Sequence, residues 1–400
     1  MQKKWMFVIR DHNLNRIAII DRVLSWDGAR AENDKGAFTL LLPPTHSLEL
    51  FAVDNIIEFW RSEDDGKTWK LDGKTCWFIR DAFFSWDGGK EAIEITGHDT
   101  LGLIDRRIVA WYAVANAELA QNYYSKKTGP ADQAIWELFY ENLGAGVVGY
   151  DPLDVPASVA GDSTTIFSPT DRQMTLISME DMPSQAPLIS LEFAWKSVLT
   201  AMKDVANASA AQDYRLIFDI EYDPDSPMPF VFKIWGKLRG VDRTTGDNRV
   251  IFSRQHENVA SISLRQIHSD EATWIHVGGS GQGSLRIMQA VASEQGSFRR
   301  SPFYPIEGFI ENTKTADQAT LQSTGEGELF RRRARFEFSG EAKDGPTTAF
   351  GRTYDYGDRV LCEHRGVVGV TRISRYRTTL SAGHESIAIP FETEENTVVD

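Results

Sequence analysis

The chain has 400 residues, of which 42% are hydrophobic and 25% charged, which is enough length for two or three domains with separate cores. It carries 43 basic and 57 acidic residues, a formal net charge of −14, so the molecule as a whole repels phosphates and a DNA-binding role is disfavoured. Its two cysteines, Cys76 and Cys362, are too far apart to indicate a disulfide framework or a zinc cluster, and we expect both to be buried.

The N-terminal segment mixes charged and aromatic residues with apolar ones, among them Trp5, Arg10, Asp11 and Arg16. A secretory signal peptide needs an uninterrupted apolar stretch, and a membrane-spanning helix needs roughly 18 apolar residues in a row. Because the chain shows neither pattern, we expect synthesis in a cytoplasm.

The first hundred residues alternate between apolar and polar side chains. Phe38, Leu40 and Leu42 fall on one face of a segment that two prolines end, and Ile93 and Ile95 repeat the pattern. Alternation with a period of two predicts strands.

The segment SWDG occurs twice, at residues 25–28 and 85–88. An Asp-Gly step at a strand end predicts a tight hairpin turn, because both residues tolerate positive φ angles. A calcium or catalytic role for Asp27 or Asp87 is the alternative, but neither has the acidic neighbours that a metal loop requires.

A short helix is predicted directly after the second of these hairpins. Gly97 is expected to end a strand, and Asp99 or Thr100 is placed to cap the helix. The apolar stripe of this helix would consist of Leu101, Ile104 and Ile108.

Two arginines, Arg106 and Arg107, then lie near the opposite side of that helix, where they would form ion pairs or subunit contacts. The alternative is that His98 and Asp99 form a catalytic dyad. Adjacent residues rarely point at one another and no nucleophile is indicated, so we favour the capped helix.

Helical periodicity replaces the alternation between about residues 110 and 212. One helix is predicted between Pro130 and Gly144, and a second over residues 191–210. Their buried faces would consist of Ile135, Leu138, Phe139 and Leu143 in the first and Phe193, Val198, Met202 and Val205 in the second. The segment 150–174 between them predicts an irregular excursion, and strands return at 214–224, 229–236 and 248–264.

The two ends of the chain share a weak internal repeat. Residues 78–95 align with residues 372–389, so that Ile79, Gly89, Glu91, Ile93 and Ile95 fall on Ile373, Gly383, Glu385, Ile387 and Ile389. A strand opening precedes each copy, at Asp54 and at Asp358. The repeat predicts two small β-barrels of similar design, one near each end, with helices inserted between them.

A glycine-rich segment, VGGSGQGSLR at 277–286, contains Gly279, Gly281 and Gly283 and ends at Arg286. A phosphate-binding loop would need a lysine and a hydroxyl, and a dinucleotide site would need a helix opening in a βαβ unit. Gly283 leads to Ser284, Leu285 and Arg286 with no lysine, so a flexible or closely packed backbone turn is favoured over a nucleotide site.

Three further patterns leave other chemistries open. His256, His268 and His276 lack the helical spacing of a zinc protease, and a glycosidase pair cannot be assigned because carboxylates are plentiful. The basic aromatic segment 330–342 predicts a strand with outward arginines at a subunit interface more than a nucleic-acid site, since the protein is acidic.

Several of these stretches, taken in order, resemble phage tail proteins of the Gp37-like kind, which are baseplate or tail-tip hub proteins of siphophages. The stretches are IIEFWR, FSWDGGKEAIEITGHDTLGLIDRRIV, AIWELFYENLG, VGGSGQGSLR and YDYGDRVLCEHRGVVGVTRISRY. The resemblance extends from about residue 20 to the C-terminus and is least marked over 145–190.

The resemblance implies a β-rich α+β fold with two tube-like β-barrel domains and an inserted helical or α+β region. The expected parts are a first barrel at 1–110, the inserted region at 111–245 and a second barrel with associated α/β elements at 246–400. It further implies a homotrimer whose six barrels join a hexameric tail tube to a three-fold tip and line the DNA ejection channel.

The implied place is the virion tail tip. The implied partners are the distal tail or tail tube proteins above, tip or fibre proteins below and the tape measure protein. Phage DNA would pass through the lumen without specific binding, and contact with the host envelope would be indirect. No cofactor, metal or enzymatic activity is expected, and the interface candidates are Asp99, Arg106, Arg107, Gly279, Gly281, Gly283 and Arg286.

Two other functions stay open: a tail-associated hydrolase of cell wall or polysaccharide, and a host receptor-binding module. Because the resemblance extends from about residue 20 to the C-terminus, we expect no residues to be left over for a separate hydrolase domain. The net charge of −14 suits both a channel wall that does not bind DNA and a soluble surface.

Overall fold

The computed structural model describes residues 4–62, 64–87, 90–109, 125–145, 173–193, 196–210, 212–292, 303, 305–313, 318–344, 348–381 and 383–393. The chain forms two compact units. Unit 1 comprises Met1–Ala260, Glu341–Val360 and Arg372–Phe391, and unit 2 comprises Ser261–Gly340, Leu361–Thr371 and Glu392–Asp400. None of the described helices is long and apolar enough to cross a membrane. The division into 1–110, 111–245 and 246–400 stays a prediction.

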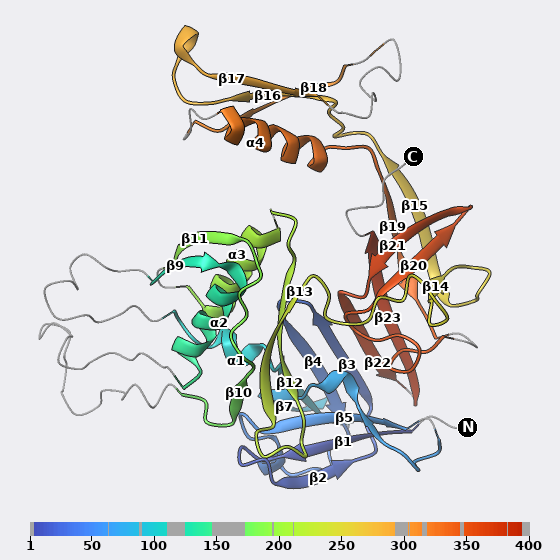
Figure 1. Ribbon diagram of the computed structural model, residues 1–400. Helices are drawn as coiled ribbons and strands as arrows, with labels where there is room; N and C mark the ends of the chain where they lie inside the picture. The colour runs from blue at the N-terminus through green and yellow to red at the C-terminus, as the bar shows by residue number, and fades with distance from the viewer. Residues whose placement is uncertain are drawn as a thin grey trace, which may run out of the picture. The chain divides into compact units, whose positions relative to one another are not determined.

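Unit 1 is built on an antiparallel run of strands in the order β22-β3-β4-β8-β7-β5-β1-β2 (Figure 1). These are β1 (Lys4–Arg10), β2 (Arg16–Ile20), β3 (Ser25–Ala31), β4 (Asp34–Leu42), β5 (Ile56–Ser62), β7 (Trp77–Asp87), β8 (Lys90–Asp99) and β22 (Arg375–Ser381); β6 (Lys70–Leu71) adds to β5, and the short helices η1 (Leu48–Phe51) and η2 (Asp72–Lys74) lie in the connections. The expected strand-rich α+β fold is confirmed. In the described residues this run does not return to its start, so closure into a tube stays a prediction.

An aromatic core covers one face of these strands. It gathers Phe7, Trp26, Phe38, Phe59 and Trp77 from five different strands. The Trp26 ring lies 5.1 Å from the ring of Phe7, 5.3 Å from that of Phe38 and 5.5 Å from that of Trp77. Such contacts add about 0.5–1.5 kcal/mol each to the burial of the rings. The alternation predicted at Leu40, Leu42, Ile93 and Ile95 is confirmed, because all four are buried in this core.

An α/β region packs against a second core. Ile57 and Trp77 face the aromatic core, whereas their chain neighbours Ile56 and Phe78 join the second core, as the alternation of strand side chains requires. The elements of the region are α1 (Gly102–Asp105), β9 (Ser125–Pro130), α2 (Ala131–Asn142), β10 (Ile177–Met179), β11 (Leu188–Phe193), α3 (Val198–Ala210), β12 (Leu216–Tyr222) and β13 (Phe230–Gly236). Figure 1 shows α1, α2 and α3 gathered beside β12 and β13.

The first of the two predicted helices is confirmed as α2, whose four predicted apolar side chains are fully buried. The second begins later than predicted, at Val198. Phe193 is buried but belongs to β11, because residues 188–193 pair with β9 along their whole length. The predicted excursion at 150–172 lies outside the described residues.

The hairpin turn predicted at Asp27 is wrong. Asp27 and Gly28 lie inside β3 and pair with strands on both sides. Gly28 is needed there because a Cβ atom would lie 2.7 Å from the Trp26 ring. The hairpin predicted near Asp87 is confirmed, since Asp87 is paired with Lys90 where β7 meets β8.

The end of β8 also differs from the prediction. The strand continues through Gly97 to Asp99, and a Cβ atom on Gly97 would lie 1.9 Å from the carbonyl oxygen of Phe78. The helix α1 that follows has only four residues. Ile108 is 47% exposed, so the predicted apolar stripe ends at Ile104.

The predicted internal repeat has a structural counterpart in two hairpins, β7–β8 and β22–β23 (His384–Thr393). The two hairpins share one register: Phe83 pairs with Glu94 and Asp87 with Lys90, and at the aligned positions Arg377 pairs with Ala388 and Ser381 with His384. The remaining strands of the C-terminal part are β14 (Ile251–Phe252), β15 (Val259–Ile267), β19 (Arg335–Ala342), β20 (Arg359–His364) and β21 (Val367–Arg372).

Both hairpins are anchored in the same way. The N–H of Ile79 donates to the carbonyl of Asn55, and its own carbonyl accepts from the N–H of Asp54. The equivalent bonds of Ile373 go to the carbonyl of Asp358 and come from the N–H of Gly357. The repeat is therefore real at the level of the backbone, but Asp54 corresponds to Gly357, one residue before the predicted Asp358.

Unit 2 contains a three-stranded sheet in the order β17-β16-β18. The strands of this sheet and the helices next to them in sequence are β16 (Trp274–Gly278), the short helix η5 (Gly283–Leu285), β17 (Met288–Ala292), β18 (Glu307–Glu311) and α4 (Gln318–Arg331). Their core contains Ala272, Ile275, Val277 and Leu321. The strand predicted over 330–342 starts only at Arg335. Arg331 ends α4 instead, where its guanidinium pairs with Glu328.

Candidate functional site

Arg30 lies at the centre of a buried ion network in unit 1. Its Nε atom is 3.0 Å from Oδ2 of Asp99, its Nη2 atom is 2.9 Å from Oδ1 of Asp219, and its Nη1 donates to the carbonyl of Gly73. Arg239 completes the network, with Nη2 2.8 Å from Oδ2 of Asp219. We call Arg30, Asp99, Asp219 and Arg239 the Arg30 network.

Strand geometry brings these charges together. Arg30 comes from β3, Asp99 from the end of β8 and Asp219 from β12, so the network joins the first sheet to the α/β region. The guanidinium of Arg239 lies 4.5 Å from the centre of the Tyr356 ring, which belongs to the C-terminal part of unit 1. Three segments that are distant in sequence therefore meet at one point.

The protonation states of the network follow from burial and charge. Burial by itself would lower the pKa of Arg30, but the carboxylates of Asp219 and Asp99 reverse that effect and raise the pKa of Arg30 well above its ordinary value. Burial raises the pKa of Tyr356, so its phenol stays neutral. A buried charge that loses its partner is strongly destabilising, so the network depends on all of its members.

A second network ties β5 to the C-terminal hairpin. Nη1 of Arg61 lies 2.5 Å from Oδ1 of Asp72, its Nε pairs with Glu385, and its Nη2 donates to the hydroxyl of Thr378 at 3.1 Å. Burial alone would lower the pKa of Arg61, and the two carboxylates raise it above its ordinary value. We call this group the Arg61 network.

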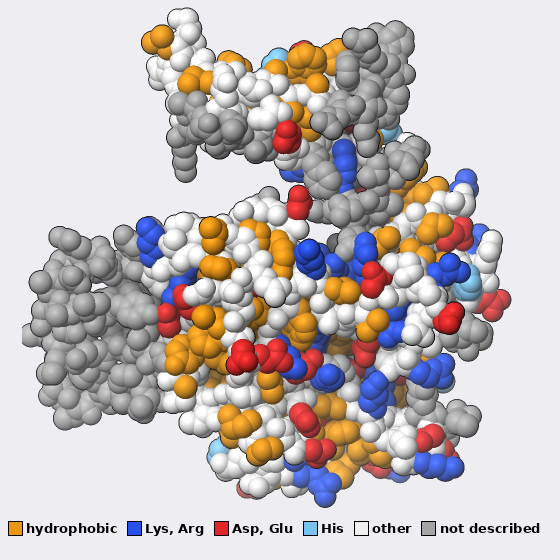
Figure 2. All heavy atoms as spheres, in the orientation of Figure 1, with side chains coloured by type: hydrophobic (Ala, Val, Ile, Leu, Met, Phe, Trp, Pro, Cys, Tyr) orange, Lys and Arg blue, Asp and Glu red, His pale blue; other side chains and the backbone are white. Residues whose placement is uncertain are grey.

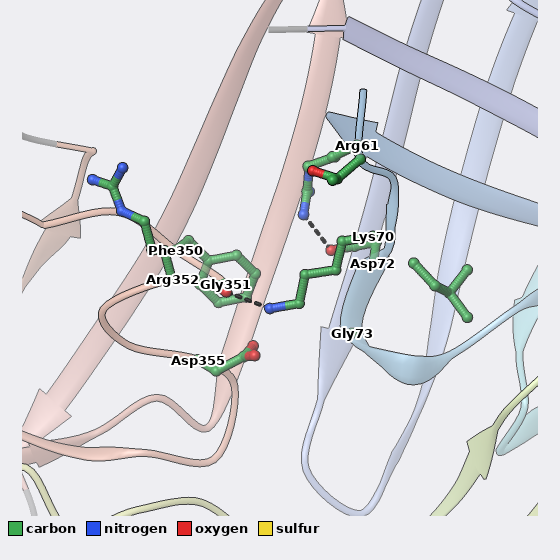
Figure 3. Close-up of a pocket in the computed structure, with 10 residues that line it drawn as sticks. Arg61, Lys70, Asp72, Gly73, Phe350, Gly351, Arg352 and Asp355 are labelled. Atoms are coloured by element: carbon green, nitrogen blue, oxygen red, sulfur yellow. Dashed lines mark hydrogen bonds and ion pairs between the residues drawn. The ribbon is translucent and has the colours of Figure 1, made fainter. Parts of the chain in front are cut away.

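A cavity of about 320 Å³ lies beside the Arg61 network, between the β6 segment and the loop at 350–355. Figure 3 shows the Lys70 amine directed at the carbonyl of Gly351, to which it donates a hydrogen bond. The described residues that line the cavity are Arg61, Thr68, Lys70, Leu71, Asp72, Gly73, Phe350, Gly351, Arg352 and Asp355. These residues include no histidine or cysteine, and the described residues contain no metal-binding group of acids, histidines and cysteines. The arrangement joins two segments of unit 1.

The catalytic dyad of His98 and Asp99 is not formed. The carboxylate of Asp99 accepts from Arg30 and from the N–H of Leu101, whereas Nδ1 of His98 lies 2.9 Å from the backbone carbonyl of Asp99. Burial lowers the pKa of His98. The predicted capping of α1 by Asp99 or Thr100 is wrong, because the N-cap is Leu101 and it makes no side-chain cap bond. Asp99 is instead part of a buried ion network that the sequence pattern did not predict.

Arg106 and Arg107 lie after α1. Nη2 of Arg106 is 2.6 Å from Oδ1 of Asp54, and Arg80 pairs with the same carboxylate at 3.0 Å. Burial would raise the pKa of Asp54, but these two arginines lower it below its ordinary value. Burial, with the neighbouring charge of Arg106, lowers the pKa of the half-buried Arg107. The predicted ion pair exists at Arg106, and subunit contacts of both arginines stay a prediction.

The glycine-rich segment connects β16 to β17 in unit 2. Gly281 and Gly283 have φ angles of +97° and +56°, which glycine adopts without strain, and Gly279 donates to the carbonyl of Ile287. Nη2 of Arg286 lies 2.9 Å from Glu311. The segment is therefore a backbone turn, as favoured by the sequence, and its residues 281–285 are exposed.

Sequence analysis missed the charged residues at the centre of both networks. For Asp219 the available signal was a charge among the apolar residues of LIFDIEY, and Glu58 in IIEFW, outside both networks, shows the same pattern. Glu58 is fully buried and accepts from Arg10 at 2.5 Å and from the Tyr222 hydroxyl at 2.6 Å. Buried charges in strands require partners, so such positions predict ion networks.

On the viewed surface of unit 1, basic and acidic side chains are interspersed (Figure 2). Unit 1 also contains exposed ion pairs, such as Arg377 with Asp27 and Lys196 with Asp204. Such exposed pairs contribute little to stability, about 0–1 kcal/mol each. Buried ion groups such as the two networks are therefore expected to contribute more to the stability of unit 1 than these exposed pairs.

Comparison with solved structures finds the same fold in three tail proteins. The tail protein from Neisseria meningitidis MC58 aligns with a TM-score of 0.53 and 12% identity, over 98% of this chain and 97% of that chain. The 43 kDa tail protein of prophage MuSo2 from Shewanella oneidensis gives 0.55 and 11%, over 96% and 97%. Prophage tail protein gp18 from Listeria monocytogenes EGD-e gives 0.53 and 10%, over 98% and 95%.

Comparison with curated protein sequences finds no match. In contrast, the model of one protein family matches residues 6–391, which is nearly the whole chain and includes both networks and the glycine-rich turn. The chain therefore belongs to the family of Siphovirus ReqiPepy6 Gp37-like proteins.

Proposed function

We propose that this chain is a structural hub protein at the tail tip of a long-tailed phage. Three copies form a ring that joins the hexameric tail tube to the three-fold tip and lines the channel for DNA. Family membership and the fold shared with phage tail proteins support a tail component. The finer assignment is supported by the repeat, because three copies with two repeats each present six similar hairpins to a hexameric tube.

The observation that carries this proposal is the pairing of β22 with β3. Seven consecutive residue pairs, from Arg375 with Ala31 to Ser381 with Ser25, join the C-terminal hairpin to the N-terminal strands. The Arg30 and Arg61 networks lie beside this junction. A ring that alternates two repeats needs a rigid junction of this kind within each copy.

The proposed contacts follow from this position. Tail tube or distal tail proteins bind above, tip or fibre proteins bind below, and the tape measure protein and the DNA occupy the lumen. The net charge of −14 suits a wall along which DNA slides without binding. The role is structural and not enzymatic, and contact with the host envelope is indirect.

Labelling of intact phage particles tests the proposal. Antibodies against the purified chain are expected to bind at the tail tip, and particles made without the chain are expected to lack complete tails. Label on the capsid or along the tube, or complete tails without the chain, would contradict it. Release of sugar or peptide fragments from cell walls by the purified chain, abolished by a single carboxylate substitution, would favour a hydrolase instead.

A further inference from the structure

The repeat includes more of the chain than the two hairpins. In each part a strand pair, β3–β4 or β15–β19, is followed by two further paired strands, β5 with the short β6 or β20 with β21, and then by the hairpin. The pairing of β15 with β19 is marked by the bond of the Ser263 hydroxyl to the carbonyl of Ser339. By order and pairing, β3 corresponds to β15, and β7 corresponds to β22.

One pairing between the two repeats occurs within the chain. The outer edge of β22 pairs antiparallel with β3, so a hairpin of the second repeat binds a strand of the first. Because β7 corresponds to β22 and β15 corresponds to β3, the equivalent pairing would join β7 to β15. No such pairing occurs among the described residues.

Both strands have a free edge where this pairing would form. β5 pairs with β7 only at Phe78 and Trp77, so the described part of β7 beyond Ile79 bonds to β8 alone. In the described residues β15 pairs with β19 alone. Long strands with unpaired N–H and C=O groups bind other strands readily, and proteins normally protect such edges.

The free edge of β7 also exposes apolar side chains. Phe83 is 64% exposed, Phe84 42% and Trp86 71%. Phe84 is paired with Ile93, which is buried in the aromatic core, so the apolar surface of that core continues onto the exposed hairpin. Phe84 and Trp86 lie on one face of β7 and Phe83 on the other, and exposed apolar side chains grouped on a strand are typical of a protein interface.

We propose that β7 of one copy pairs with β15 of a second copy, in the antiparallel direction that β22 and β3 use. This inference rests on the proposed hub function and adds the surfaces through which the copies bind. Each copy offers one β7 edge and one β15 edge, so the contact is head to tail and closes into a ring when the rotation allows. The ring then alternates β22–β3 junctions within copies and β7–β15 junctions between copies.

Charge supports this direction of pairing. Within the chain, Arg375 at the start of β22 pairs with Ala31 at the end of β3. The aligned residue of β7 is Asp81, which is exposed, and the end of β15 carries the exposed Arg265. Antiparallel pairing brings these opposite charges close together, whereas parallel pairing separates them.

Cysteine cross-linking between differently tagged chains tests the contact. A chain with Asp81→Cys is co-expressed with a chain carrying Arg265→Cys and then oxidised. The native Cys76 and Cys362 are buried and do not interfere. A disulfide-linked dimer that carries both tags is expected, and the matched control pairs Arg265→Cys with Leu48→Cys, at an exposed residue outside both strands, which should give no mixed dimer.

A charge exchange supplies a second readout in the full chain. Asp81→Arg is expected to raise the dissociation constant of the ring about tenfold, because Arg265 then faces a like charge. Combination with Arg265→Asp is expected to restore it. Trp86→Lys should weaken assembly by at least a similar factor, and thermal unfolding of each variant shows whether unit 1 is folded.

The outcomes separate the inference from the function on which it rests. If trimers form but no mixed dimer appears, or the charge exchange restores nothing, the contact lies elsewhere and the inference fails while the hub function stands. A chain that stays monomeric and gives no mixed dimer also overturns the inference. Failure of the antibodies to label the tail tip contradicts the hub function, whether or not the cross-link forms.

Discussion

Removal of the Arg30 side chain is the most direct perturbation of unit 1. The Arg30→Ala variant leaves the carboxylates of Asp99 and Asp219 buried, with Arg239 as the remaining cation of the network. Loss of one partner from a buried ion pair costs about 3–5 kcal/mol, because the desolvated charge that stays behind is no longer compensated. We therefore expect the free energy of unfolding to fall by that amount.

The matched control is Arg377→Ala in the same sheet. Arg377 pairs with Asp27, but the side chains of both are exposed, at 58% and 36%. Exposed pairs contribute about 0–1 kcal/mol, so this variant should unfold at nearly the same denaturant concentration as the unaltered chain. Arg30→Lys should behave more like Arg30→Ala, since an ammonium group cannot reach all three partners of the guanidinium at once.

Urea unfolding followed by tryptophan fluorescence measures these differences, because Trp26 and Trp77 lie in the aromatic core of unit 1. A double variant, Arg30→Met with Asp99→Asn, should recover part of the loss by removing one of the uncompensated charges. If Arg30→Ala costs no more than Arg377→Ala, the network does not hold the three segments together, and the argument for a rigid junction fails.

Three further predictions concern other parts of the chain. Asp54→Asn should lower the free energy of unfolding by less than about 1 kcal/mol at neutral pH, and this difference should disappear in acid. The pKa of Asp54 is lowered on folding, so its contribution to stability is present above the unfolded pKa near 3.9 and is lost as the pH falls through the folded pKa. Urea unfolding between pH 2 and 7 measures the difference. Gly97→Ala should prevent soluble folding, because its Cβ would overlap the backbone carbonyl of Phe78. Gly327→Ala has open space in α4 and should stabilise the chain by about 1 kcal/mol. Thermal unfolding distinguishes the two variants. Burial raises the pKa of both Cys76 and Cys362, so neither thiol should react with a thiol reagent at pH 8 until urea unfolds the chain.

Local patterns predicted the strands and α2 because burial there follows the period of the element. The alternation at Phe38, Leu40 and Leu42 is a property of one strand with one buried face. The Asp-Gly step at Asp27 has the same local composition as a hairpin turn, and only the packing of the Trp26 ring over Gly28 places it inside β3. Local sequence holds no information about that contact.

The ion networks could not be predicted in detail for a related reason. Arg30 is separated from Asp99 by 69 residues and from Asp219 by 189, so their meeting depends on the complete topology. A charge in an apolar strand indicates that a partner exists but does not identify it. The internal repeat was detectable because it preserves the hairpin register, while the one-residue difference at Asp54 appears only in the backbone hydrogen bonds.

The two repeats differ most at one connection, between the two strands of the first strand pair. Only residues 32–33 separate β3 from β4, whereas residues 268–334 separate β15 from β19 and carry the β17-β16-β18 sheet and α4. An insertion at the end of a strand pair leaves the pairing itself intact, because the added chain starts and ends at neighbouring positions. The glycine-rich turn and Arg286 belong to this insertion. Their partners, Glu311 and the carbonyl of Gly278, lie within the insertion as well, so the repeat can form its strand edges independently of them.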